Sequence, residues 1–402
     1  MNNTTNNYRK PNPIIYGIFT FMSIILSWLK FNLKIEKNEL KGVKGPYVVI
    51  ANHESALDFV NVARAIKKRA HFVISNAFYN TFPFRFIVER VGLIPKNQFQ
   101  TMPSDLKKMK TAVDNELPLV IFPAGLMPEN GICTPIPKAT GKALKWLNQD
   151  VYLAKSNGSY LTNPKWSSKW RRGKTTLNVE KFIAKEDLDK YTAEEIQEMV
   201  EKALYFDAYK NNGLDKIPFK NGDNVVGLEN VLYKCPLCGK EYTIISEDKT
   251  VLKCVSCGYK VYSDKTGALY RDKGKEAIFK YPSDWSLYIE KEIEKKIDKN
   301  PSYKLECLAD VFILDEKKHK FVKGGTARVT LNKDGFILNG MVDGEKLDKE
   351  YSIKNYPSLP LKPGKSFEIQ DGKTILRICP IVPKVCTEWV TTAEIFYKKS
   401  LL

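Results

Sequence analysis

Two groups of residues in this sequence have the types and spacing that chemistry requires. The first is His53 with Asp58 five residues later, and the second is a set of four cysteines in two pairs. Imidazole titrates near neutral pH, so a His can act as a general base when an acid holds one ring nitrogen and leaves the other free. Because the chain contains only 3 His, one beside a carboxylate is informative.

The position of His53 restricts how it can meet Asp58. It follows the apolar run Val48–Ile50 in the segment Ala51-Asn52-His53-Glu54-Ser55-Ala56-Leu57-Asp58. Five residues on one regular helix are separated by about 500°, so the two side chains would not share a face. They can meet only if His53 lies in the turn before a helix and Asp58 reaches back from the first turns of that helix. We therefore predict a base with its orienting acid after a buried strand.

The cysteines follow the pattern Cys-x2-Cys-x15-Cys-x2-Cys and are Cys235, Cys238, Cys254 and Cys257. This spacing is typical of a zinc site, and four thiolates leave no open position for substrate, so the predicted zinc is structural. Gly239 and Gly258 allow the positive φ of the tight turns that follow each pair. The module resembles a zinc ribbon. Iron is an alternative, whereas two disulfides do not suit a cytosol-facing chain.

Short apolar runs alternate with amphipathic segments around His53. The predicted strands are residues 48–50, 72–74, 119–122 and 151–154, and a half-buried strand precedes them at residues 31–35. The predicted helices are residues 55–68, 104–115 and 138–148. This alternation indicates an α/β domain with a mostly parallel sheet. Ligands of such sheets bind beyond the carboxyl ends of the strands, which is where His53 lies.

The first forty residues contain an apolar segment, Ile14 to Leu29, between flanking Lys and Arg residues. As a helix it spans about 24 Å, less than the ~30 Å hydrocarbon core of a bilayer. A cleaved signal peptide lacks its cleavage site here, and a full span or a buried core helix are alternatives. We favour a helix that is embedded in one leaflet or re-enters it, with the rest of the chain at the cytoplasmic face of the membrane.

The remaining sequence predicts further elements. Thr192 and Glu195 form a capping box before a helix at residues 193–204, and residues 211–223 have the composition of a linker. From about residue 306, short alternating segments with turn pairs predict a small β-rich domain that is loosely similar to pleckstrin-homology-like domains, with a final helix at residues 391–398. The predicted domains are residues 1–40 (membrane-associated segment), 41–227 (catalytic domain), 228–262 (zinc ribbon) and 263–402 (β-rich accessory domain).

Composition limits the class of protein. The 402 residues are 43% hydrophobic and 27% charged, which excludes a disordered, fibrous or multi-span membrane protein. The net charge of +18 favours anionic partners such as lipid headgroups, acidic carrier proteins or nucleic acid. A basic aromatic stretch, Trp166–Lys174, suits an anionic membrane surface.

Four sequence blocks in order, within about residues 14–185, resemble the 1-acylglycerol-3-phosphate acyltransferase family of glycerolipid acyltransferases. The blocks are Asn52-His53 with Asp58, Phe84-Arg85-Phe86-Ile87-Val88-Glu89-Arg90-Val91-Gly92-Leu93-Ile94-Pro95-Lys96, Phe122-Pro123-Ala124-Gly125-Leu126-Met127 and Val151-Tyr152-Leu153-Ala154. An apolar amino-terminal helix is also typical of this family. The resemblance implies a glycerolipid O-acyltransferase of phospholipid biosynthesis.

The resemblance also implies a mechanism. His53, oriented by Asp58, would deprotonate a hydroxyl of a lysophospholipid, which attacks the thioester of acyl-CoA or an acyl carrier protein. Backbone donors around Gly125 would stabilise the oxyanion. The expected substrate-binding residues are Asn52, Arg85, Arg90, Lys96, Gly125 and Lys138.

This sequence departs from the family pattern where the acceptor phosphate binds. The Glu and Arg of the third block are replaced by Ala124 and Met127, a family Arg by Lys96, and an upstream Lys by Asn76. 1-Acylglycerol-3-phosphate remains the expected acceptor, and a different lipid acceptor is the alternative. A second alternative is a non-catalytic adaptor for membranes or nucleic acid. Nucleic acid is not an expected partner, since it leaves His53 and the apolar amino terminus unexplained.

Overall fold

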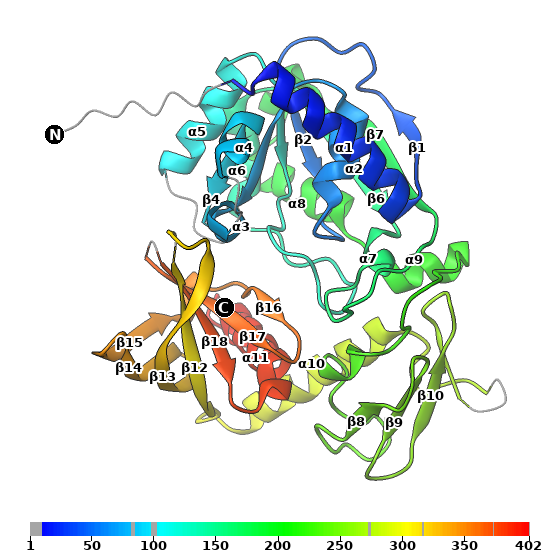
Figure 1. The fold of residues 1–402 in the computed structure, drawn as a ribbon, viewed down its shortest axis with the longest axis vertical. Coiled ribbons are helices and arrows are strands. Elements are labelled where there is room, and N and C mark those ends of the chain that lie inside the picture. Colours follow the sequence, from blue (N-terminus) through cyan, green and yellow to red (C-terminus); the bar gives the residue numbers. More distant parts are fainter. Residues whose placement is uncertain are drawn as a thin grey trace. The chain divides into compact units, whose positions relative to one another are not determined.

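The computed structural model describes residues 10–81, 85–97, 103–271, 275–315, 317–372 and 374–401. The chain divides into two compact units. Unit 1 comprises Met1–Met127, Cys133–Thr162 and Arg172–Phe206, and unit 2 comprises Pro128–Ile132, Asn163–Arg171 and Asp207–Leu402. Figure 1 shows the elements of both units. Each unit is described separately below.

Unit 1 is built on a seven-stranded sheet of order β1-β7-β6-β2-β5-β3-β4. Its strands are β1 (Leu33–Asn38), β2 (Val48–Ala51), β3 (His71–Ser75), β4 (Leu93–Lys96), β5 (Leu119–Ile121), β6 (Val151–Asn157) and β7 (Thr175–Ile183). The strands β6, β2, β5, β3 and β4 are parallel to their neighbours in this row, and β7 runs antiparallel to β6. The carboxyl ends of these five parallel strands therefore meet at one edge of the sheet.

Helices cover both faces of this sheet. They are α1 (Pro13–Phe31), α2 (Asp58–Ile66), α3 (Asn76–Thr81), α4 (Arg85–Val91), α5 (Pro103–Asp114), α6 (Ala139–Leu147), α7 (Ser159–Thr162) and α8 (Ala193–Leu204). Val48 and Ile50 of β2 pack with α5, α6 and α8 in one core cluster. On the opposite face Phe19 of α1 contacts Phe72 of β3, with ring centroids 6.1 Å apart, and Figure 1 shows α1 and α2 in front of the sheet.

Helix α1 begins and ends at clear sequence signals. The side chain of Asn12 accepts hydrogen bonds from the first free amides of the helix, Pro13 occupies the first turn, and Asn32 ends the helix in the left-handed conformation. One face of α1 packs into unit 1 and buries Tyr16, Ser23, Ser27 and Phe31. Within the predicted membrane-associated segment, residues 1–40, α1 therefore packs into unit 1 and β1 belongs to the sheet.

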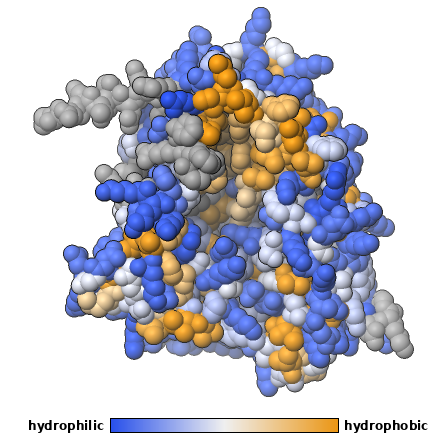
Figure 2. Space-filling view, in the orientation of Figure 1, coloured by the Kyte–Doolittle hydropathy of each residue, from blue (hydrophilic) through white to orange (hydrophobic). Residues whose placement is uncertain are grey.

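The opposite face of α1 is exposed and apolar. Ile14, Phe21 and Trp28 are 76%, 62% and 58% exposed, and their spacing of seven residues places them in one row, which we call the outer stripe of α1. Figure 2 shows the corresponding hydrophobic area over this helix. Within the described residues α1 is the one helix long and apolar enough to cross a membrane.

Unit 2 contains two antiparallel sheets. The smaller has the order β11-β10-β9-β8, and the larger has the order β15-β14-β13-β12-β18-β17-β16. The strands are β8 (Ile244–Ser246), β9 (Val251–Cys254), β10 (Lys260–Ser263), β11 (Leu269–Tyr270), β12 (Leu305–Asp315), β13 (Lys320–Asn332), β14 (Gly335–Val342), β15 (Glu345–Ser352), β16 (Leu361–Lys362), β17 (Ser366–Asp371) and β18 (Thr374–Pro380). The helices are α9 (Ala208–Asp215), α10 (Pro282–Lys299) and α11 (Cys386–Lys399).

One hydrophobic core joins the cysteine module to the larger sheet of unit 2. It contains Cys235 and Cys254 of the module, Trp285 of α10, Phe336 of β14 and Trp389 of α11. The indole N–H of Trp285 donates to the backbone oxygen of Lys234 at 2.8 Å. The predicted ranges of the module and the accessory domain are separate, whereas in the structure the two parts share one core.

The segment 211–223, interpreted as a linker, is packed within unit 2. Its first residues continue α9, and the amide of Asn212 donates to the backbone oxygens of Ile217 and Thr266. Phe219 is buried, and its N–H donates to Lys265 O at 2.7 Å. The linker interpretation was wrong because a polar composition also suits a segment whose amides bond to other backbone groups.

Candidate active site

The loop between β2 and α2 brings His53 and Asp58 into contact. Asp58 is the first residue of α2, and its Oδ2 accepts a hydrogen bond from His53 Nδ1 at 3.1 Å. The same oxygen accepts from the backbone N–H groups of Glu54 at 2.6 Å and Ser55 at 2.7 Å. This is the geometry that the five-residue spacing required, with the His in the turn and the acid reaching back. The arrangement places the imidazole at the carboxyl edge of the sheet.

The environment of the pair suits a base that must meet a substrate. The Asp58 side chain is fully buried, whereas the His53 side chain is 20% exposed. Because the carboxylate accepts the proton of Nδ1, Nε2 carries the lone pair in the neutral ring. The Phe122 ring, in the loop after β5, lies 5.0 Å from the imidazole centroid. The imidazole is thus fixed by its acid and by an aromatic neighbour.

Glu54 is a residue of this loop that sequence reasoning did not single out. It is 1% exposed, and its carboxyl oxygens accept from the Asn52 side-chain amide at 3.1 Å and from the Tyr160 N–H at 3.0 Å. Burial, followed by the nearby Asp58 charge, raises the pKa of Glu54 to about 8. No sequence signal marks this burial, because a Glu in a loop is normally solvated.

Asn52 is also buried, and its amide is used within the protein. Its Oδ1 accepts from Ser156 N at 2.8 Å and its Nδ2 donates to Ser156 O at 2.9 Å, so the side chain continues the pairing of β2 with β6. This geometry gives Asn52 a role in holding the loop. Contact of Asn52 with substrate stays a prediction.

The cations expected to bind the acceptor lie in different environments. Lys96 ends β4 at the same sheet edge as His53, and burial lowers its pKa while Asp105 partly opposes this shift. Arg90 and Lys138 are exposed, Arg90 in the last turn of α4 and Lys138 before α6. Arg85 begins α4, and its side chain lies outside the described part of the chain. Lys96 is therefore the candidate that the sheet itself positions.

Gly125 lies in the turn after β5 with a φ of +67°, and no atom lies within 4 Å of the position of a Cβ there. Open space of this kind is consistent with close approach of a ligand to the main chain. However, its N–H donates to Phe122 O at 3.0 Å. This amide must therefore exchange its partner before it can donate to an oxyanion.

Comparison with known proteins identifies a family to which part of this chain is similar. Residues 32–152 match the family model named Acyltransferase, and this range includes β2, His53, Asp58 and Lys96. The chain carries an acyltransferase-family domain. The family resemblance predicted from the four sequence blocks is thereby confirmed.

The chain is also similar to a solved structure, the 1-acyl-sn-glycerophosphate (LPA) acyltransferase PlsC from Thermotoga maritima, with 16% identity and a TM-score of 0.42. That similarity covers 50% of this chain and 79% of the other. No curated protein matches the sequence. The assignment of the acyltransferase domain thus depends on the family model.

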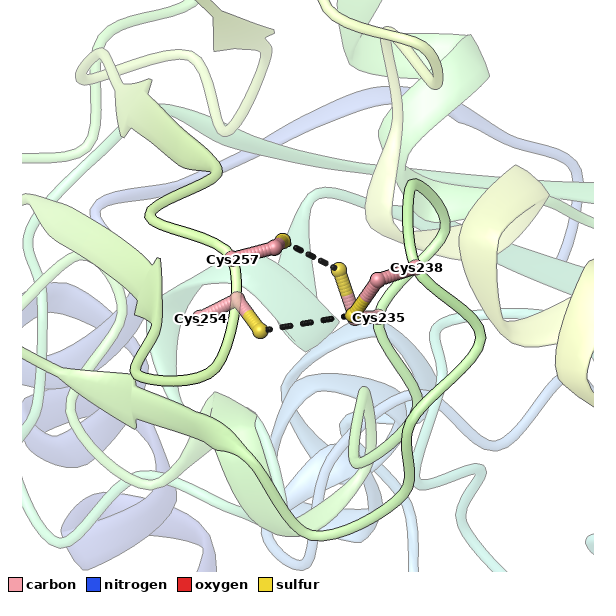
Figure 3. Close-up of side chains that lie close together, drawn as sticks. All are labelled: Cys235, Cys238, Cys254 and Cys257. Carbon is pink, nitrogen blue, oxygen red and sulfur yellow. Dashed lines mark hydrogen bonds between the residues drawn. The ribbon is translucent and has the colours of Figure 1, made fainter.

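Outside the acyltransferase domain, the four cysteines of the predicted zinc site form a cluster (Figure 3). Their sulfur atoms all lie within 4.8 Å of one another, and the Cys235–Cys257 and Cys238–Cys254 pairs are separated by 3.7 Å and 3.8 Å. A tetrahedron with metal–sulfur bonds of about 2.3 Å has edges of about 3.8 Å. The observed distances therefore fit a four-thiolate zinc ion.

The turns of the cysteine cluster support the same conclusion. Gly239 and Gly258, which follow the two pairs, have φ values of +71° and +75°, as their positions predicted. Each donates its N–H to the backbone oxygen of the first cysteine of its pair at 3.0 Å. The two turns are thus equivalent, and each presents two sulfurs to a common centre. A ligand set of four thiolates has no open position, which favours a structural metal.

Proposed function

We propose that this protein is a lysophospholipid O-acyltransferase in which His53 is the general base and Asp58 orients it. Nε2 takes the proton of the acceptor hydroxyl as the oxygen attacks the thioester carbonyl of acyl-CoA or an acyl carrier protein. The C–S bond then breaks, and the thiolate leaves with the proton from His53, so no acyl-enzyme forms. The observation that carries this proposal is the His53–Asp58 hydrogen bond beside a partly exposed imidazole, within the segment that matches the acyltransferase family.

The proposed acceptor is 1-acylglycerol-3-phosphate, whose phosphate Lys96 would bind. Lys96 is held in the sheet and partly desolvated, so an anion beside it regains the charge interaction that burial removes. The alternative is an acceptor without a terminal phosphate. It is favoured by Ala124, which is buried, and Met127, which stand where the family has charged residues.

Replacing Lys96 with Ala is expected to raise the KM for a phosphate-bearing lysolipid at least tenfold, while kcat changes little. A charge-assisted hydrogen bond is worth about 1.5–3 kcal/mol, which corresponds to this factor or more. Steady-state kinetics with lysophosphatidate and with an uncharged monoacylglycerol measure the effect. The matched control is Lys142→Ala, since that side chain is 74% exposed on α6. Equal KM values for the Lys96 variant and the wild type would favour the phosphate-free acceptor.

We further propose that the outer stripe of α1 binds the membrane at its cytoplasmic face. The stripe has no charged residue, and its Trp28 lies under the guanidinium of Arg172, 5.7 Å from the ring centroid. Trp and Arg together suit the headgroup region of an anionic leaflet. The inner face of the same helix is buried in unit 1, which favours a helix lying in the interface over a full span.

Phe21→Asp is expected to weaken binding to anionic vesicles at least tenfold. Transfer of a Phe side chain from water into lipid stabilises the bound state by about 1.5–3 kcal/mol. The Asp variant lacks this contribution, and its carboxylate is repelled by the anionic headgroups. Vesicle flotation at several lipid concentrations measures the affinity. Because Phe21 is exposed, the melting temperature should stay within about 2 °C of the wild type. Unchanged flotation would contradict a role of α1 at the membrane.

Unit 2 is proposed to be a zinc-stabilised accessory domain of this enzyme. Its larger sheet begins with β12 at the centre, which pairs with both β13 and the last strand β18, and α11 follows β18. This order and the final helix support the expectation of a pleckstrin-homology-like domain. A zinc ion held by the four cysteines would stabilise the smaller sheet beside it.

A further inference from the structure

Glu54 connects the loop that holds His53 to a different part of unit 1. Through Oε2 it accepts the N–H of Tyr160, at the start of α7, and through Oε1 it accepts the amide of Asn52. Asn52 is itself bonded to Ser156 of β6. The residue next to the candidate base is thus tied, directly and through Asn52, to the end of the neighbouring strand.

The same residue also meets the candidate acid. Its backbone N–H donates to Asp58 Oδ2 at 2.6 Å, the oxygen that accepts from His53 Nδ1. Glu54 therefore contacts Asp58 with its main chain and the β6–α7 turn with its side chain. A shift of the carboxyl group would move the peptide that positions both members of the pair.

We propose that Glu54 is a positioning residue of the acyl-transfer site, which fixes His53 and Asp58 by tying their loop to the β6–α7 turn. This inference rests on the proposed function of the His53–Asp58 pair. Glu54 acts through these two residues and makes no contact with the reacting atoms. Loss of the tie should lower kcat and leave KM for the acyl donor nearly unchanged, because substrate binding uses other groups.

The protonation state of Glu54 is part of this role. Its raised pKa of about 8 keeps the Glu54 carboxyl group protonated at pH 7, so that no negative charge on Glu54 competes with Asp58 for the imidazole. The other titratable groups that interact with Glu54 are Asp58 of α2 and the Cys133 thiol, which in turn interacts with Lys155 of β6. As pH rises through about 8, Glu54 ionises in its buried site beside Asp58, and repulsion between the two side chains would displace the loop that holds His53.

Two variants of Glu54 test the proposal. Glu54→Gln cannot ionise and keeps the size and one of the two acceptor oxygens, so its kcat at pH 7 should lie between those of the wild type and Glu54→Ala. Glu54→Ala removes the tie, and its kcat should fall about 100-fold, the effect of a displacement of about 1 Å of a catalytic group. In wild type, kcat should fall as pH rises above 8, and this fall should be absent in Glu54→Gln. Glu180→Gln, on the exposed surface of β7, is the matched control.

A readout independent of activity is the imidazole spectrum of His53. The chain has 3 His, so the signals can be assigned with His53→Asn. The His53 resonances should show an inflection near pH 8 that Glu54→Gln abolishes. The inference is overturned if Glu54→Gln keeps this inflection or if folded Glu54→Ala keeps wild-type kcat. An inactive wild type that still shows a Glu54-dependent inflection would contradict the proposed function but not the tie.

Discussion

His53→Ala is expected to lower kcat for acyl transfer by about 10²–10⁴-fold, the usual contribution of a positioned general base. The substitution removes the atom that takes the proton from the acceptor hydroxyl. The protein should stay folded, because the side chain is partly exposed and has one hydrogen-bond partner in the described structure. The measurement is transfer of labelled acyl groups from acyl-CoA and from an acyl carrier protein to a panel of lysolipids.

The matched control for this experiment is His319→Asn. His319 lies in a turn of unit 2 with a φ of +51°, which Asn tolerates better than Ala. The activity of the His319→Asn variant should equal that of the wild type.

The activity of Asp58→Asn should fall between those of the wild type and His53→Ala, because the imidazole remains but loses the acceptor that sets its tautomer. Retention of full activity by His53→Ala would exclude this residue as the base, and activity absent from the wild type would support an adaptor without catalysis.

Removal of the metal from unit 2 is expected to unfold more than the cysteine module. A structural zinc site contributes about 10–16 kcal/mol in small zinc peptides, which is as large as the whole stability of most domains. Because Cys235 and Cys254 belong to the same core as Trp285 and Trp389, the loss should spread to α10. Hydrogen exchange of α10 and the module should rise strongly after chelation, while β2 of unit 1 stays protected.

Cys235→Ser tests the same claim without a chelator. The wild type should bind one zinc ion per chain, measured by elemental analysis, and the variant should lose it together with the protection of α10. Cys379→Ser is the control, because Cys379 lies on β18 outside the cluster. Loss of zinc with α10 still protected would show that the module is an independent domain.

The elements around His53 could be predicted from sequence because their signals are local. Val48–Ile50 is a buried apolar run, and the structure extends it by one residue to Ala51. Helix α8, which was predicted from the capping box of Thr192 and Glu195, has the predicted bounds, and both hydrogen bonds of the capping box are present. The helical period restricted how His53 and Asp58 could meet, and the structure has the arrangement that it allowed.

The parts that sequence analysis missed depend on contacts between distant residues. Helix α10 was not predicted, although Trp285, Ile289, Ile293 and Ile297 recur every four residues and are all buried. The range assigned to the zinc ribbon ended at residue 262, so the partner of these side chains was not apparent. Lys234, for example, is buried between Glu241 of the module and Glu292 of α10.

The burial of Glu54 could not be predicted either, because it also depends on contacts between distant residues. Its burial is created by β6 and α7, about a hundred residues later in the chain, and no local pattern distinguishes it from a solvated loop Glu. Lys96 was identified through the family resemblance, because β4, which ends at this residue, was not among the predicted strands. Residues that one loop positions against another have no local signal in this sequence.

Because one face of α1 is packed into unit 1, this helix cannot be removed without damage to the fold of that unit. In an enzyme held by a separate span, deletion of the span yields a soluble catalytic part. In this protein, deletion of residues 13–31 would expose Phe72 and the neighbouring face of the sheet to solvent. Arg64 would also lose the Ser27 hydroxyl to which it donates a hydrogen bond. A soluble form would instead need polar residues along the outward row of the helix, with its inward row kept intact.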